Sequence, residues 1–393
     1  MLDYLVDDPQ TDVIVTYLEG LHEGQRLVSI GRRAAATGTA VVAMRVGASP
    51  RGRDAAASHT GSIATADAVY DAVFRQSGVT RVRSVDGFVD AVTAFSTVPP
   101  DAYPVNEAEQ GVGVVSVSGG AAVLISDTAD RVGLPLAEFG DRSVERLQAA
   151  VPDYGSATNP VDATMTVVGD PEAFDAAIET IADDDNVTAL IIQFGNSGDE
   201  TIEDCKDKLA SVAAEHTVPI ATVFTGSTPV PETESRLRDR GILVFEDPVR
   251  AVESIHRLAD RGAFIDGPSP PGPIDLGERE PLEGGWKSVT DTLQAAGVST
   301  VEGEVVQSAV AAVTAADRLG YPVALKLDPL AVEHKSDMGG VRVGLADAAA
   351  VREAFAAVAN SAEADVVVQS MVDGIEVIAG IVDDPDFGPV MTV

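Results

Sequence analysis

Short runs rich in valine and isoleucine alternate with longer helix-like segments from residue 12 to residue 262, and this alternation restricts the possible folds most strongly. Strands joined by helices form parallel sheets, because the returning helix brings each strand back in the same direction. Near-continuous apolar strands indicate a sheet covered on both faces. The sequence therefore predicts an α/β fold. The predicted strands are 12–20, 40–47, 111–119, 186–195, 218–226 and 242–247.

Changes in composition divide the chain into three predicted domains. Residues 1–97 and 98–263 each read as a flavodoxin-like or Rossmann-like parallel-sheet domain, separated by a proline-bearing polar stretch. A linker rich in proline, glycine and acidic residues follows at 264–282. The last part, 283–393, begins with a helix and continues with a strand at 321–328, a loop, a second strand and a further helix.

The charge of the chain excludes several classes of function. Its 62 acidic residues against 27 Lys and Arg give a formal charge of −35, spread along the chain. Nucleic-acid binding needs clustered cations, so we expect no nucleic-acid partner. The acidic surface is typical of proteins that stay soluble in strong salt. No stretch approaches the roughly 20 apolar residues that span a bilayer, and the acidic start argues against an export signal. The single cysteine, Cys205, suits a reducing cytoplasm.

One histidine stands in a run of small residues, RDAAASHTGS, which leads into a predicted helix. Backbone amides at a helix start favour an anion, so a phosphoryl group on His59 would be stabilised there. A nucleophilic histidine needs a carboxylate to hold its other ring nitrogen, and Glu19 ends the strand 12–20. A hydrogen-bonded loop histidine is the alternative, and His22 is a rival base.

Paired glycines, Gly119 and Gly120, follow the strand 111–119 and open a helix. Glycines there let backbone amides approach an anion, although glycine in such turns also serves helix packing alone. The stretch lacks the Lys-Ser/Thr ending of a Walker A loop. The nearby TNPVDAT, residues 158–164, reads as a turn that can reach the carboxyl edge of the sheet.

The stretch EHKSDMGG concentrates polar residues in a loop between two strands. Lys326 precedes it inside an apolar strand, where a lysine is expected only beside a partner or a ligand phosphate. A metal site made of His334 and Asp337 is an alternative, but no further His or Cys stands at a ligating spacing.

Taken together, these stretches resemble the NDP-forming acyl-CoA synthetases, also called ADP-forming acetate–CoA ligases, which are related to succinyl-CoA synthetase. The matching stretches occur in the order of that family: DYLVDDPQTDVIVTYLEG, RDAAASHTGS, SGGAAVLISD, TNPVD, GYPVALKLDPLAVEHKSDMGGVRVGL and IVDDPDFGPV. The resemblance implies that residues 283–393 are part of an ATP-grasp domain.

The resemblance also implies a reaction. Acyl-CoA and phosphate give an acyl phosphate, which phosphorylates His59 with Glu19 in support. His334 then carries the phosphoryl group to ADP. Lys326 matches a lysine that binds nucleotide phosphates, Gln369 and Met371 match the adenine pocket, and Gly119 and Gly120 match the helix start that faces the phosphohistidine. The implied substrates are ATP or ADP and coenzyme A, with Mg²⁺, whose ligands stay unassigned.

The sequence also departs from the family pattern. No G-x-G-x-x-G unit precedes residue 12, so we expect this sequence to lack the CoA-binding domain of single-chain members and the start of the first domain. We also expect the ATP-grasp part to lack the acidic strand residues that hold Mg²⁺ in the family. We therefore expect a homo-oligomer or a complex with a chain that supplies the missing domains. The alternatives are a catalytically silent acyl-CoA-sensing module and an inactive remnant of such an enzyme.

Overall fold

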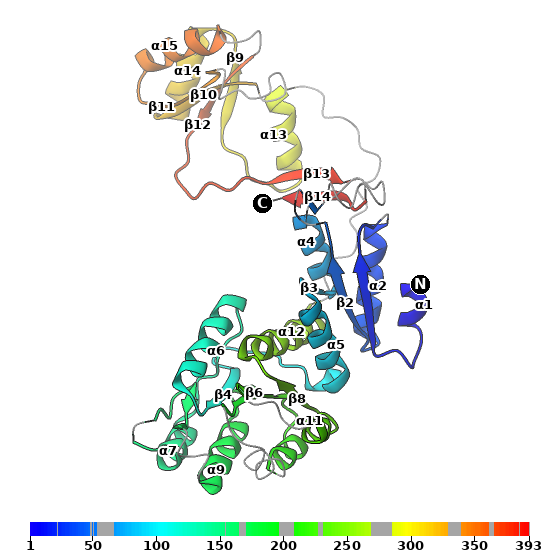
Figure 1. Ribbon diagram of the computed structural model, residues 1–393. Coiled ribbons are helices and arrows are strands. Elements are labelled where there is room, and N and C mark those ends of the chain that lie inside the picture. Colours follow the sequence, from blue (N-terminus) through cyan, green and yellow to red (C-terminus); the bar gives the residue numbers. More distant parts are fainter. Residues whose placement is uncertain are drawn as a thin grey trace. The chain divides into compact units, whose positions relative to one another are not determined.

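The computed structural model (Figure 1) describes most of the chain and divides it into two compact units. The first unit comprises residues 1–273 together with 380–392, and the second comprises residues 274–379. The described residues are 1–21, 23–47, 49, 51–52, 67–153, 155–164, 170–195, 208–226, 231–268, 285–328, 339–360, 365–384 and 386–392.

A parallel sheet of order β1-β2-β3 begins the first unit. Helices α2 and α4 pack against one face of this sheet, with α1 beside α2, and α5 packs against the other. The predicted strands at 12–20 and 40–47 are confirmed, whereas β3 was missed because three residues are too short for a periodic signal. The elements are α1 (Leu2–Val6), β1 (Val13–Leu18), α2 (Gly24–Ala36), β2 (Ala40–Arg45), α4 (Asp67–Ser77), β3 (Thr80–Val82) and α5 (Val85–Thr97).

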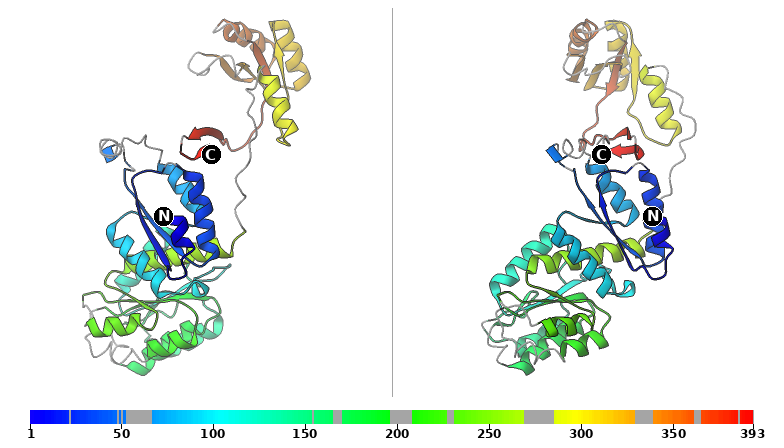
Figure 2. Two further views of the ribbon diagram at one scale, coloured as in Figure 1. Left: turned by 90° about the vertical axis from the view of Figure 1, so that its right-hand side faces the viewer. Right: turned by 45° about the vertical axis from the view of Figure 1, so that its right-hand side comes forward.

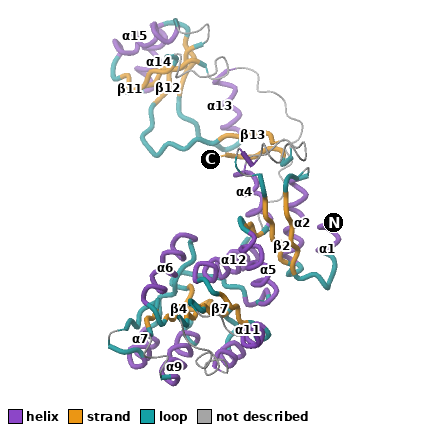
Figure 3. The backbone as a smooth tube through the Cα atoms, in the orientation of Figure 1, coloured by secondary structure: helices purple, strands orange, loops and turns teal. Residues whose placement is uncertain are grey.

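A second parallel sheet has the order β5-β4-β6-β7-β8. Helices α6 and α12 cover one face, and α7, α9 and α11 cover the other, as the flanking purple tubes in Figure 3 show. Complete burial explains why β4, β6, β7 and β8 read as continuous apolar runs. The elements are β4 (Gly111–Ser116), α6 (Gly119–Val132), α7 (Asp141–Ala150), β5 (Val161–Asp162), α9 (Pro171–Ala182), β6 (Val187–Gln193), β7 (Ile220–Val223), α11 (Pro231–Arg238), β8 (Ile242–Phe245) and α12 (Pro248–Asp266).

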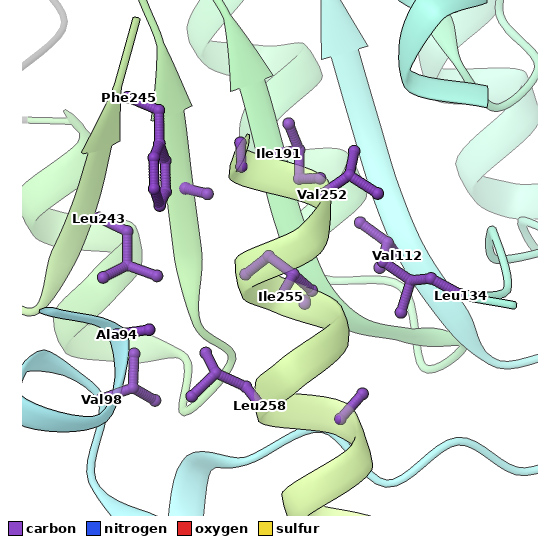
Figure 4. Close-up of a cluster of buried hydrophobic side chains, with 14 of the residues drawn as sticks. Ala94, Val98, Val112, Leu134, Ile191, Leu243, Phe245, Val252, Ile255 and Leu258 are labelled. Carbon is purple, nitrogen blue, oxygen red and sulfur yellow. The ribbon is translucent and has the colours of Figure 1, made fainter. Parts of the chain in front are cut away.

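Helix α12 joins the two parallel sheets through one hydrophobic core. Ile255 and Leu258 of α12 meet Ala94 and Val98 from the end of α5 on one side and the strands of the larger sheet on the other (Figure 4). Both views in Figure 2 show α12 at the junction of the two sheets. The same core includes Val42 of β2. The first and second predicted domains therefore form one compact unit.

The end of α12 corrects the predicted start of the linker. The helix continues to Asp266 instead of ending before residue 264. Phe264 explains the extension, because its ring lies against Gly78, two residues before β3. The apolar contact keeps these three residues helical despite the Pro-rich and Gly-rich sequence that follows.

The second unit contains an antiparallel sheet of order β11-β10-β12-β9. Helices α14 and α15 pack together on one face of this sheet. The strand at 321–328 is confirmed, but β9 and α14 were not identified from the sequence. The elements are α13 (Gly285–Ala295), β9 (Gly303–Val306), α14 (Ala309–Leu319), β10 (Val323–Leu327), β11 (Val341–Leu345), α15 (Ala348–Ala359) and β12 (Val366–Ser370).

A hairpin of β13 (Gly380–Asp384) and β14 (Gly388–Thr392) joins the first unit. The amide of Gly24 donates to the Asp386 carbonyl (2.9 Å), and the Phe387 ring packs edge-on against Tyr70. A side chain at residue 24 would overlap the Phe387 ring, so this approach requires glycine. Among the described residues, no helix is long and apolar enough to cross a membrane.

The core around α12 makes a testable prediction. Ile255→Ala should lower the free energy of unfolding of the first unit by roughly 2–5 kcal/mol, because Ile255 is fully buried and a cavity would remain. Urea denaturation followed by far-UV circular dichroism measures this loss. Val310→Ala is the control, since Val310 is exposed on α14.

The single tryptophan, Trp286, lies in α13 of the second unit, so its fluorescence follows that unit alone. The Ile255→Ala variant should leave the fluorescence transition in place. An unshifted circular dichroism transition would contradict the role assigned to the shared core.

Candidate functional site

The carboxyl ends of β1 and β2 lie side by side and place Glu19 at the rim of the smaller sheet. Leu18 is in register with Arg45, and the Val46 amide donates to the Leu18 carbonyl (3.0 Å). Glu19 follows β1 directly and is exposed. His59 and the rival base His22 lie outside the described residues. The structure thus positions Glu19 at the rim from which the chain departs towards His59, and their contact stays a prediction.

An ion pair joins the two ends of the segment that contains His59. Arg45 closes β2, Asp67 opens α4, and the guanidinium Nη1 of Arg45 donates to Oδ1 of Asp67 (2.9 Å). The Arg45 side chain is only 2% exposed, and its guanidinium carbon lies 4.0 Å from the centre of the Tyr70 ring. A buried cation held by a carboxylate and an aromatic face is a rigid anchor. Arg45 and Asp67 were missed from the sequence, although a lone arginine ending an apolar strand was a usable signal.

Asp67 remains ionised in this arrangement. Burial opposes its ionisation, but the hydrogen bond and charge of Arg81, with the charges of Arg45 and Arg83, hold the pKa of Asp67 below its usual value. Tyr70 completes the rim, because its hydroxyl accepts the Leu21 amide (3.1 Å). The segment after β1 and both ends of the His59 segment are therefore tied to one cluster.

The carboxyl rim of the larger sheet carries a buried polar network. The Ser116 hydroxyl donates to Oε1 of Gln193 (2.7 Å), and Nε2 of Gln193 donates to the Thr225 hydroxyl (2.7 Å). These bonds link the ends of β4, β6 and β7, where ligands of parallel sheets bind. Ser116 and Gln193 were also missed, because within apolar strands they carry no periodic signal.

Gly119 and Gly120 open α6 beside this network and are exposed. The N-cap residue, Ser118, makes no side-chain cap, so its hydroxyl leaves the first amides of the helix open to a ligand. A side chain on Gly119 would lie 3.2 Å from Oδ2 of Asp162. The glycine thus lets the helix start approach a carboxylate, and the anion-binding role of both glycines stays a prediction.

The stretch TNPVDAT is not only a turn, which corrects the sequence analysis. Val161 and Asp162 form β5, which pairs with β4, and two residues are too few to be recognised as a strand. The Asn159 side chain accepts the Val114 amide and donates to two backbone carbonyls, of Val112 and Ala137. Asn159 is therefore structural, and Asp162 is the residue that reaches the rim.

In the second unit, Lys326 and Gln369 lie on the sheet face opposite α14 and α15. Val323, Leu325 and Leu327 of β10 point into the core with those helices, so Lys326 projects from the other face. Gln369 is in register with Ala324 and shares this face. The Met371 sulfur accepts the Gly344 amide (3.1 Å), next to the end of β12. The sheet thus brings the predicted nucleotide residues to one side.

His334 and Asp337 lie outside the described residues, so the structure does not test the alternative metal site. In the part of the chain that is described, no group of three or more His, Cys, Asp or Glu side chains could hold a metal ion. The described residues therefore offer no ready-made Mg²⁺ site.

Three family models match the chain in order. Residues 1–95 match the succinyl-CoA ligase like flavodoxin domain, residues 112–249 the Ligase-CoA domain, and residues 285–393 the ATP-grasp domain. ADP-forming acetate–CoA ligase I of Archaeoglobus fulgidus is 31% identical over 414 residues, which include 99% of this chain. The chain belongs to the NDP-forming acyl-CoA synthetase family. It spans only 58% of the length of the Archaeoglobus relative.

Two of the relatives are separate subunits of one enzyme. The alpha subunit of ADP-forming acetate–CoA ligase I from Pyrococcus furiosus is 28% identical over 66% of this chain and 54% of its own. The beta subunit of that enzyme is 34% identical over 25% of this chain and 47% of its own. Among solved structures, acetyl-coenzyme A synthetase 1 of Ca. Korarchaeum cryptofilum with phosphate and ADP gives a TM-score of 0.58. That structure is 26% identical, over 66% of this chain and 55% of its own.

The anchor at the His59 segment generates a prediction. Arg45→Met should lower the free energy of unfolding of the first unit by about 3 kcal/mol, because it removes one partner of a buried ion pair. Arg83→Met is the matched control. Arg83 approaches the same carboxylate at 3.6 Å but is 65% exposed, so its loss should cost less than about 1 kcal/mol. Equal losses in urea denaturation would contradict the anchoring role.

Proposed function

We propose that this chain is the phosphoryl-transfer part of an enzyme that converts acyl-CoA, ADP and phosphate reversibly into a carboxylic acid, CoA and ATP. The supporting observation is that one chain combines the parallel-sheet rim carrying Glu19 with an antiparallel sheet face carrying the partly exposed Lys326 and Gln369. Acetate or another short acid is the proposed substrate, after the name of the Archaeoglobus relative.

In the proposed first steps, phosphate displaces CoA from the acyl group and gives an acyl phosphate. A ring nitrogen of His59 attacks the phosphorus, the bond from phosphorus to the carboxylate oxygen breaks, and the acid leaves with that electron pair. Glu19 accepts the hydrogen of the other ring nitrogen and stabilises the charged imidazole. Gly119 and Gly120 donate backbone amides to the phosphoryl oxygens. Positioning and charge stabilisation account for most catalysis of this kind.

In the second half, His334 receives the phosphoryl group and delivers it to ADP. Lys326 neutralises the nucleotide phosphates, while Gln369 and Met371 contact the adenine. Mg²⁺ belongs to the proposed reaction because it neutralises nucleotide phosphates when bound. No described residue is assigned to it.

The chain is proposed to work with further polypeptide that completes the CoA-binding part, as a homo-oligomer or a complex. Strand β1 is an edge strand whose Val15 and Tyr17 side chains are half-exposed. Exposed apolar edges of this kind favour pairing with another segment. We further propose a cytoplasmic enzyme of a salt-rich cell, on the basis of the charge of −35 and the single cysteine.

The relay makes opposite predictions for two labels. Labelled acetyl phosphate should phosphorylate the wild type and His334→Ala but not His59→Ala. Labelled ATP should label the wild type at both histidines and His59→Ala at His334 alone. It should not label His334→Ala, because label from ATP must pass through His334 before it reaches His59. The label should be acid-labile and base-stable, and the assay uses high KCl with Mg²⁺.

His216→Ala is the control for this assay, because His216 pairs with Asp183 (3.6 Å) away from both rims. It should retain both labels. Labelling by acetyl phosphate that survives His59→Ala would contradict the proposed nucleophile. Absence of all labelling would contradict the relay and would favour the alternative, a catalytically silent acyl-CoA-sensing module.

The nucleotide face gives a separate prediction. Lys326→Met should weaken ADP binding by about tenfold or more in calorimetry, because a charged contact to phosphate is lost. Lys287→Met is the matched control, since Lys287 is exposed on α13 in the same unit. Equal ADP affinity in both variants would contradict the proposal that Lys326 binds the nucleotide phosphates.

A further inference from the structure

A cavity of about 790 Å³ lies in the first unit between α4, β3 and α12. We call it the arginine cavity, because its wall includes five arginines: Arg75, Arg81, Arg83, Arg257 and Arg261. It runs along β3, the sheet edge opposite β1 and Glu19. Its volume falls in the range of sites for small organic ligands.

The wall of the arginine cavity has more cationic than acidic side chains, whereas the chain as a whole is strongly acidic. Acidic residues outnumber Lys and Arg by 62 to 27 overall. The cavity wall instead combines five arginines with three carboxylates, those of Asp71, Glu253 and Asp260. A local excess of cations in a strongly acidic protein concentrates anions from solution.

Two of these arginines have no carboxylate partner among the described residues. Arg261 is 3% exposed, and its Nη1 and Nη2 atoms donate to the carbonyls of Gly78 and Thr39, both at 2.6 Å. Its charge is therefore buried against neutral groups, and burial lowers the pKa of Arg261. Arg75 is exposed and makes no ion pair within the described chain.

Buried N–H groups in the cavity wall also lack acceptors. Nε of Arg81, Nη1 of Arg257 and Nε of Arg261 are inaccessible to solvent and have no hydrogen-bond partner among the described residues. Because these three atoms are closed to solvent, they add positive charge to the wall but are not contact points for a ligand in the cavity.

Ion pairing within the protein does not explain the whole cluster. Asp71 and Asp67 form ion pairs with Arg81 at 2.5 and 2.7 Å, and both also form ion pairs with Arg83. Glu253 forms ion pairs with Arg257 at 3.1 Å and with Arg131 at 3.2 Å. Asp67, Asp71 and Glu253 are thus each shared between arginines, and the remaining wall carboxylate, Asp260, pairs with His256 at 3.3 Å.

Part of the wall is apolar. Phe74 of α4 and Phe264 of α12 line the cavity together with Val79. A bare phosphate ion would leave this apolar surface and most of the volume unused. A phosphorylated organic molecule would satisfy both parts of the wall.

We propose that the arginine cavity binds a small organic molecule with two or more phosphate groups. The phosphates lie against Arg257 and Arg75, and the buried charge of Arg261 adds to the local excess of cations. The organic part lies against Phe264. This site is independent of the proposed phosphohistidine relay.

The test is calorimetry on the full chain at constant ionic strength with pyrophosphate and with ADP as probes. Lys326→Met serves as the background, so that the predicted nucleotide face binds the probes more weakly than in the wild type. One probe molecule should bind per chain, and ADP should bind more tightly than pyrophosphate because it also contacts the apolar wall. Adenosine, which has no phosphate, should not bind measurably.

Two variants locate the binding. Arg257→Gln and Arg75→Gln should each weaken pyrophosphate and ADP by about tenfold, the effect of one charged hydrogen bond. Arg75 is exposed, so its variant keeps the fold intact if Arg257→Gln does not. Arg131→Gln is the matched control, because it pairs with the same Glu253 but does not line the cavity.

Failure to bind either probe would overturn the proposal. Binding that is equally strong in Arg75→Gln, Arg257→Gln and Arg131→Gln would overturn it too. Neither result depends on phosphorylation of His59, so this test and the test of the relay fail separately.

Discussion

The packing of α12 against both parallel sheets is the constraint on which the first unit depends. Its apolar side chains fill the space between α5 and the larger sheet, so neither sheet has a separate core on that side. Arg261 and Arg250 extend the same helix into polar contacts. Arg250 donates two hydrogen bonds to the buried carboxylate of Asp90 in α5 (2.8 and 2.6 Å), and these bonds hold α12 against α5. Because α12 packs against both sheets, it holds them in place relative to each other within the first unit.

In the first unit, the described residues that we propose to act in phosphoryl transfer follow strand ends. Parallel strands end at one edge of each sheet, and the polar residues that follow them are brought together there whatever their distance in sequence. Arg45 and Asp67 show how the smaller sheet uses this geometry, because one ion pair closes the segment that contains His59. Gln193 does the same for the larger sheet by linking Ser116 to Thr225. The backbone amides of Gly119 and Gly120 are thereby presented from a rigid support.

The second unit uses a different principle. Its antiparallel sheet is covered by helices on one face, and alternation along β10 turns Lys326 away from them. A lysine inside an apolar strand was already a signal in the sequence, and the register of β12 adds Gln369 to the same face. The arginine cavity follows neither principle, since its residues come from helix flanks and one strand edge. No spacing along the chain relates Arg75 to Arg257 or Arg261.

The sequence by itself determined the α/β class, the long buried strands and the candidate residues that stand out chemically, because these depend on local composition and periodicity. Strands β3 and β5 escaped it, since two or three residues carry no period. The Asp266 end of α12 escaped it because a contact with Gly78, far away in sequence, decides it. Only the tertiary structure decided that two predicted domains share one core and that Arg45 meets Asp67. It also decided that five arginines surround one cavity in an acidic chain, because contacts between distant residues depend on packing, which local sequence does not encode.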